Sequence, residues 1–256
     1  MAKIISIHSF RGGTGKSNTT ANLAVLLAAS GKRVGVVDTD IQSPGIHVIF
    51  ARPASEVSYA LNDYLWGRCG IEEAAYDVTP AAIGAADPNA DRPRLFLIPS
   101  SIDTRDIARV LREGYDVARL NDGFQKLIRV LKLDYLLIDT HPGVNEETLL
   151  SIAISDLLLL ILRPDNQDFQ GTSVTVELAR RLEVREILIV LNKVPSSVNA
   201  EQLRGQVEIA YGAPVIGALP LCEQIAELAS SAIFINRHPD HPVTAQLCAI
   251  AARIMH

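Results

Sequence analysis

The sequence has few cysteines, few aromatic residues and no long apolar run, and these shortages exclude several classes of protein. Its three cysteines, Cys69, Cys222 and Cys248, are far apart and form no C-x-x-C pair, which argues against a disulfide framework or a zinc site. No apolar run approaches the ~18 residues needed to cross a bilayer. The N-terminal residues lack the apolar core and cleavage site of a secretory signal. We therefore expect a cytoplasmic protein without a transmembrane segment.

The chain also lacks an excess of positive charge. Its 24 Lys and Arg residues against 29 Asp and Glu residues give a net charge of −5, which argues against a broad nucleic-acid-binding surface. In the first candidate for a local basic patch, acids lie between the arginines, so a solvated, self-paired helix face is favoured over a DNA contact. The second candidate set is equally ambiguous. The two sets are Arg105, Arg109, Arg112 and Arg119, and Arg180, Arg181, Arg185 and Arg204. Non-specific DNA binding is thus considered but not favoured.

Short apolar runs alternate with longer amphipathic stretches along the 256 residues. Because the apolar runs are continuous, they predict strands covered on both faces, at 4–8, 34–38, 95–98, 135–139, 157–162, 187–192 and 215–219. The amphipathic stretches predict helices at 16–30, 103–113, 116–132, 168–182, 200–211, 222–229 and 243–254. This alternation predicts an α/β fold, a mainly parallel twisted sheet with helices on both faces. No repeat or linker divides the chain, so residues 1–256 are interpreted as one domain, with a loop at 87–93.

A glycine-rich loop, Arg11-Gly-Gly-Thr-Gly-Lys-Ser17, follows the first predicted strand and opens the first predicted helix. Glycines allow successive N–H groups to converge on phosphate oxygens, and the start of the helix adds a positive end. Lys16 is expected to reach the β- and γ-phosphates, and Ser17 to place its hydroxyl on Mg²⁺. The loop therefore predicts a nucleotide site formed by Gly12, Gly13, Thr14, Gly15, Lys16, Ser17 and Asn18.

Acidic residues end two of the predicted strands. One strand ends at Asp38, shortly before Asp40, and the other ends at Asp139, before a turn that contains His141 and Gly143. Ligands gather at the carboxyl ends of parallel strands. An apolar strand that ends in an acid is the Walker B pattern, so Asp139 is expected to hold Mg²⁺, directly or through water. A histidine at such a turn is more typical of a surface residue than of a general base, and His141 is left out of the catalytic set.

In this order, the motifs resemble those of the MinD/ParA family of P-loop ATPases, whose deviant Walker A loop reads K-G-G-x-G-K-S/T. The resemblance runs from Ala2 to the final predicted helix. The family's signature lysine, which crosses to the partner's nucleotide in the dimer, is replaced by Arg11. This arginine is expected to keep that contact as an arginine finger, to leave a slower or differently regulated ATPase, or to be a solvated residue.

The resemblance implies roles for further residues. Asp40 would position the attacking water or support Mg²⁺, with Asp38 a structural acid or a helix cap, and Gly143 would sense the γ-phosphate in the mobile turn after Asp139. Asn192, followed by Lys193, would read the adenine base, with Pro220 and Glu223 on its other side. The implied catalytic set is Lys16, Asp40 and Arg11, and the implied metal set is Ser17, Asp40 and Asp139.

The function implied by the resemblance is an ATP- and Mg²⁺-dependent switch. Two copies would form a homodimer on binding ATP, and slow, dimer-dependent hydrolysis, stimulated by an unidentified activating or cargo protein, would position or partition a cargo. No MinD-type membrane-targeting tail follows the last predicted helix, so no membrane anchor is expected. The alternatives are a nucleotide-binding regulatory scaffold with negligible turnover, which Arg11 makes plausible, and an ATP-dependent biosynthetic enzyme of the dethiobiotin synthetase type.

Overall fold

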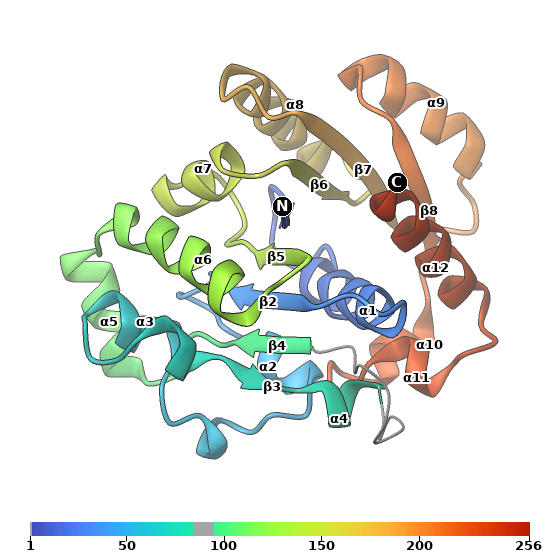
Figure 1. The fold of residues 1–256 in the computed structure, drawn as a ribbon. Coiled ribbons are helices and arrows are strands. Elements are labelled where there is room, and N and C mark those ends of the chain that lie inside the picture. Colours follow the sequence, from blue (N-terminus) through green and yellow to red (C-terminus); the bar gives the residue numbers. More distant parts are fainter. Residues whose placement is uncertain (1, 84–94) are drawn as a thin grey trace.

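A computed structural model describes residues 2–83 and 95–256, and within these ranges the strands form one eight-stranded sheet (Figure 1). The strand order is β3-β4-β2-β5-β1-β6-β7-β8, and every neighbouring pair is parallel except β3 with β4. The strands are β1 (Lys3–His8), β2 (Val34–Asp38), β3 (Tyr76–Asp77), β4 (Leu95–Ile98), β5 (Tyr135–Asp139), β6 (Leu157–Leu162), β7 (Glu186–Val194) and β8 (Val215–Pro220). The predicted loop at 87–93 lies outside the described residues.

Helices pack on both faces of the sheet because its central strands are buried throughout, as in β6, where every side chain is inaccessible to solvent. One face is covered by α1 (Lys16–Ala29), α2 (Ile46–Ile49), α4 (Thr79–Ile83), α10 (Glu223–Glu227), α11 (Phe234–Arg237) and α12 (Pro242–Met255). The other is covered by α3 (Leu61–Leu65), α5 (Thr104–Glu113), α6 (Val117–Leu131), α7 (Glu146–Ala153), α8 (Asn166–Arg181) and α9 (Ala200–Tyr211). The predicted parallel α/β architecture is thereby confirmed.

The structure differs from the elements predicted from the sequence only in short elements and in some element ends. The elements β3, α2, α3, α4, α7 and α11 were not predicted, because two to eight residues give too little periodicity to identify. Helix α8 begins at Asn166, earlier than the predicted start at Asp168, because the Asp165 carboxylate accepts the amide of Asp168 at 3.1 Å and caps the first turn.

The strand order brings three distant segments together. Strand β5 lies between β2 and β1, and Asp38 at the end of β2 is in register with Asp139 at the end of β5. The glycine-rich loop leaves the end of β1, the next strand along. Parallel pairing therefore places the loop and both acids at one edge of the sheet, where the chain order reverses.

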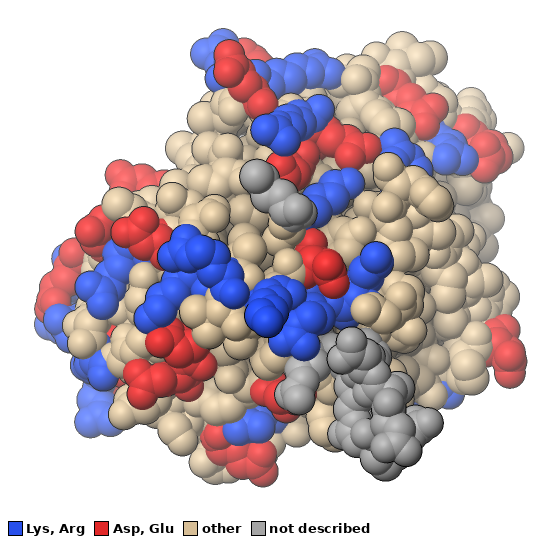
Figure 2. All heavy atoms as spheres, in the orientation of Figure 1, with Lys and Arg blue, Asp and Glu red and all other residues tan. Residues whose placement is uncertain are grey.

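Basic and acidic side chains are interspersed over the face shown in Figure 2. Two arginines of the first set considered as a DNA contact and three of the second are ion-paired within the protein. Arg105 and Arg109 contact Asp103 and Glu113 at 2.6 and 2.8 Å. Arg181 and Arg185 contact Glu177 and Asp156 at 2.6 and 3.3 Å. Among the described residues, no helix is long and apolar enough to cross a membrane.

Candidate nucleotide-binding site

The glycine-rich loop forms one wall of a cavity of about 500 Å³. None of the main-chain amides of residues 13–17 donates a hydrogen bond to a residue that the structure describes. Gly13 and Gly15 have positive φ angles of 76° and 92°, and a Cβ on Gly15 would lie 2.4 Å from Nδ2 of Asn192. These glycines let the loop curl closely enough to present consecutive unpartnered donors, a geometry that suits a phosphate group.

Lys16 is buried in the wall of this cavity. Its Nζ lies 2.7 Å from Oδ1 of Asp139, and Thr20 Oγ1 donates to the same carboxylate oxygen at 3.1 Å. Only 7% of the Lys16 side chain and 1% of the Asp139 side chain are exposed. Removing two charges from water is costly unless they are paired, so each of these residues depends on the other in this arrangement.

Asp38 holds the loop that follows β2. Its carboxylate is fully buried and accepts the amides of Asp40 at 3.0 Å and Gly45 at 3.2 Å. Burial, and then the nearby charge of Asp139, raise the pKa of Asp38 well above its ordinary value. This geometry fits the structural role expected for Asp38.

Asp40 lines the same cavity, and His141 contacts it directly. Nδ1 of His141 donates to Oδ1 of Asp40 at 2.7 Å, because a carboxylate can only accept. Burial alone would raise the pKa of Asp40, but the hydrogen bond from His141 and the positive charge of Lys16 outweigh it and lower that pKa. The interpretation of His141 as a surface residue is wrong: its side chain is 20% exposed. Only the adjacency of β2 and β5 could have revealed this contact.

Arg11 and Gly143 make contacts within their own chain. The guanidinium of Arg11 lies at the cavity, 3.5 Å from the Asp165 carboxylate, which also contacts Arg163 at 2.6 Å. Gly143 has φ 83° and its amide donates to the Ser9 carbonyl at 3.2 Å. In this conformation, the amide expected to sense a phosphate is therefore already bonded.

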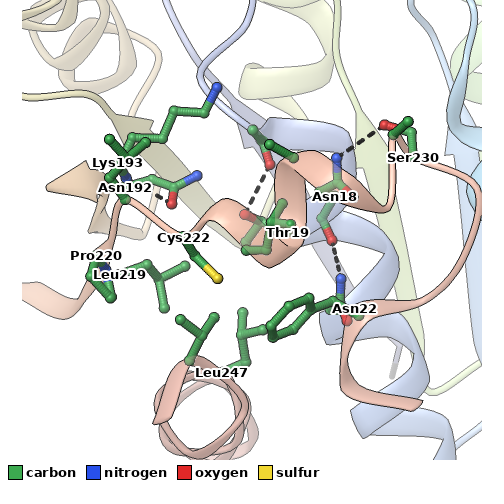
Figure 3. Close-up of a pocket in the computed structure, with 17 residues that line it drawn as sticks. Asn18, Thr19, Asn22, Asn192, Lys193, Leu219, Pro220, Cys222, Ser230 and Leu247 are labelled. Atoms are coloured by element: carbon green, nitrogen blue, oxygen red, sulfur yellow. Dashed lines mark hydrogen bonds between the residues drawn. The ribbon is translucent and has the colours of Figure 1, made fainter. Parts of the chain in front are cut away.

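A second cavity, of about 270 Å³, adjoins the first at Gly15 and Asn18 (Figure 3). Polar side chains of α1 and β7 meet here with apolar side chains of β8, α11 and α12. Besides Gly15 and Asn18, the lining includes Thr19, Asn22, Asn192, Lys193, Leu219, Pro220, Cys222, Phe234 and Leu247. Most of these residues lie outside any motif, and sequence reasoning identified only Asn192 and Pro220 beyond the glycine-rich loop.

The polar groups of the second cavity largely support the glycine-rich loop. Asn192 donates through Nδ2 to the Thr14 carbonyl at 2.7 Å, and its Oδ1 accepts the Lys193 amide at 2.9 Å. The Lys193 ammonium donates to the Gly13 carbonyl at 2.7 Å. Asn18 donates to Ser230 Oγ at 3.3 Å. The amide expected to read a base is thus engaged in bracing the loop.

The remaining predicted site residues are placed differently from one another. Ser17 lines the first cavity with the rest of the loop. Pro220 lines the second cavity, whereas Glu223 is exposed at the start of α10 and does not line either cavity. Within the described residues, no group of three His, Cys, Asp or Glu side chains is close enough to hold a metal by itself. A cation here would depend on one or two carboxylates together with ligand oxygens, as Mg²⁺ commonly does.

Comparisons with known proteins agree with the fold. A family model described as the CobQ/CobB/MinD/ParA nucleotide binding domain matches residues 5–233. An uncharacterised ATP-binding protein of Methanocaldococcus jannaschii is 28% identical over 261 residues, covering 100% of this chain and 88% of the relative. The cell division ATPase MinD of Pyrococcus furiosus superimposes with a TM-score of 0.81 at 22% identity, covering 100% of this chain and 99% of the other. MinD of Pyrococcus horikoshii, complexed with Mg-ADP, gives a TM-score of 0.79 at 22% identity, covering 99% and 96%.

Proposed function

The chain belongs to the CobQ/CobB/MinD/ParA nucleotide-binding domain family, and from this premise we propose that it binds and hydrolyses ATP with Mg²⁺. One observation carries the proposal: residues 13–17, whose amides have no partner in the part of the chain that the structure describes, line the same cavity as three carboxylates. Such a cavity offers donors and a cation to phosphate oxygens, and acids to a metal ion. The relative from M. jannaschii is named as ATP-binding.

The residues around the cavity suit distinct parts of phosphoryl transfer. We assign Lys16 and the loop amides to the phosphates, and the oxygens of Ser17, Asp40 and Asp139 to Mg²⁺, which when bound would neutralise phosphate charge. Asp40 is also assigned to orienting the attacking water. The hydrogen bond from His141 and the charge of Lys16 outweigh the effect of burial and lower the pKa of Asp40, so its carboxylate stays ionised. The second cavity, with its apolar wall and Pro220, is assigned to the base.

We further propose that hydrolysis requires two copies of the chain and that the cycle of association positions or partitions a cargo through a partner protein. Arg11 would act across the interface. It lies at the cavity, with its side chain 40% exposed, and among the described residues its guanidinium has one partner, Asp165 at 3.5 Å. Such an exposed contact is weak, so exchanging it for a contact with a second copy would cost little. MinD from Aquifex aeolicus is described in complex with its partner MinC.

The dimer requirement is tested by measuring ATP hydrolysis per chain against protein concentration, in wild type and in Arg11→Ala and Arg11→Lys. Turnover per chain should rise with concentration in wild type and Arg11→Lys, and stay low in Arg11→Ala. A rate per chain that is independent of concentration would contradict the dimer. Equal rates in all three proteins would make Arg11 a solvated residue.

A second candidate function is a nucleotide-binding scaffold with negligible turnover. The contact of Arg11 with Asp165 is the observation that favours it, because the guanidinium has a partner within its own chain and is not directed at a second nucleotide in this conformation. Tight ATP binding without product formation over many hours would support the scaffold, whereas multiple turnovers would exclude it.

A further inference from the structure

The carboxylate of Asp40 is held asymmetrically. Its Oδ1 accepts three hydrogen bonds: the Ser43 amide at 3.1 Å, the Ser43 hydroxyl at 2.9 Å and His141 Nδ1 at 2.7 Å. Its Oδ2 has no hydrogen-bond partner among the described residues. Since Asp40 lines the first cavity, Oδ2 is the oxygen left for a ligand or water there.

The three donors to Oδ1 come from different parts of the chain, so they differ in whether they can hold the Asp40 carboxylate in place relative to the rest of the cavity. Ser43 belongs to the same loop as Asp40, so its two bonds shape the loop but cannot hold it against the rest of the cavity. His141 comes from the loop after β5 and is 101 residues away in sequence. Within the described chain, it provides the carboxylate's one hydrogen bond from another structural element.

The main chain around His141 is itself anchored to the sheet and to α7. Both the amide and the hydroxyl of Thr140 donate to the Ile7 carbonyl of β1, at 3.2 and 3.1 Å. The carbonyl of His141 accepts the Thr148 hydroxyl of α7 at 3.2 Å. The main chain that carries the imidazole is thus anchored by contacts that do not involve the Asp40 loop.

We propose that His141 is a positioning residue that fastens Asp40 across the sheet and so directs the free oxygen of this carboxylate to the phosphate side of the cavity. The inference rests on the proposed function, because Asp40 acts only if nucleotide is hydrolysed. His141 is not itself the base for the attacking water. It does not line the cavity in which that water would be activated.

The first test compares His141→Ala with His141→Asn, because the asparagine Nδ2 can donate from nearly the place of the imidazole Nδ1. His141→Ala should lower the kcat of ATP hydrolysis about tenfold and leave the nucleotide Kd within about twofold, since a charge-assisted hydrogen bond is lost but no phosphate ligand. His141→Asn should recover most of the rate. Failure of His141→Asn to recover any rate would overturn the assignment.

A double-mutant cycle separates positioning from a general structural effect. If His141 acts through Asp40, His141→Ala should have no further effect on turnover in an Asp40→Ala background. Equal fold-losses in the two backgrounds would show that His141 acts independently of Asp40, which overturns the proposal.

Amide hydrogen exchange of residues 39–45 gives a readout that does not need hydrolysis. His141→Ala should accelerate exchange in this loop, His141→Asn should not, and Ser43→Ala, which removes a bond to the same oxygen, should accelerate it less. If wild type does not hydrolyse ATP but exchange responds in this way, the proposed function fails, whereas the positioning of Asp40 by His141 is still supported. Unchanged exchange in His141→Ala would show that His141 does not hold the Asp40 loop in place.

Discussion

The two adjoining cavities are built on different principles. In the first, successive amides of one loop have no partner among the described residues, and charged side chains such as Lys16, Asp40 and Asp139 line the same cavity. In the second, the polar side chains are engaged with the loop or with each other, and apolar residues from β8, α11 and α12 form much of the wall. The first cavity therefore suits a charged ligand that supplies missing partners, and the second suits an apolar surface that displaces water.

The largest expected effect follows from removing the buried ammonium of the first cavity. Lys16→Ala should weaken ATP binding by about 100-fold or more, which corresponds to ~2.8 kcal/mol, because a charge-assisted contact to phosphate is lost. Isothermal titration calorimetry measures this directly. Lys32→Ala is the matched control, since Lys32 is exposed beyond the far end of α1.

Lys16→Ala also leaves Asp139 without its ion partner, so its melting temperature must be recorded beside the binding data. If a folded Lys16→Ala variant binds ATP with wild-type affinity, the assignment of the first cavity to the phosphates is contradicted.

Asp40→Ala should separate binding from turnover within the first cavity. We expect hydrolysis to fall about 100-fold while nucleotide affinity changes little, because Asp40 is assigned to the water and to Mg²⁺, a role it shares with Ser17 and Asp139, whereas Lys16 and the loop amides hold the phosphates. Size-exclusion chromatography with ATP should then show an accumulated dimer. A variant that stays monomeric with ATP, or that hydrolyses at the wild-type rate, is the contrary result.

The charged side of the site should also impose a pH dependence on stability. Burial, then the charges of Lys16 and His141, lower the pKa of His8 from 6.5 to about 3. Since the unfolded histidine takes up a proton first, stability is complete above pH 6.5 and falls as the pH drops toward 3. When the pH is lowered from 7 to 5, His8 alone should reduce the free energy of unfolding by about 2 kcal/mol.

His8→Asn should reduce this loss while keeping a donor for the Thr140 hydroxyl, which His8 contacts at 2.8 Å. Urea unfolding of both proteins at pH 7 and 5 measures the difference. Equal losses would show that the buried histidine does not control the acid side of the stability curve.

The smallest effect is expected on the second cavity. Ala226 is exposed on α10 and lines that cavity, so Ala226→Trp should narrow it without disturbing the core. ATP should bind about tenfold more weakly, while tripolyphosphate, which has no base, should bind equally well. Equal weakening of both ligands would show that the two cavities do not divide the ligand in this way.

A region of this protein could be predicted from the sequence when the residues that form it are neighbours in the chain, and not when they are far apart. The loop at 11–17 and the helix after it depend on neighbouring residues, because glycine conformations and the start of a helix are local properties. The positions of Asp38 and Asp139 at strand ends could be predicted because each ends an apolar run. The contribution of α11 and α12 to the second cavity could not be predicted, since side chains such as Phe234 and Leu247 look in sequence like any other core residue.

His141 shows the same limit within the first cavity. Its neighbours in sequence gave no reason to expect a partner, and its contact with Asp40 exists because β2 and β5 are adjacent in the sheet. Likewise, the family resemblance assigned Asn192, at the end of a predicted strand, to a base, but its amide lies against Gly15 and donates to the loop instead.

By itself, the sequence determined the parallel α/β class and the phosphate-side loop, because hydrophobic periodicity and glycine placement act over a few residues. The tertiary structure alone decided which side chains complete each cavity and which polar groups remain free. Strand order brings together residues more than a hundred positions apart, and a group's hydrogen bonds and burial are set only by what it meets there.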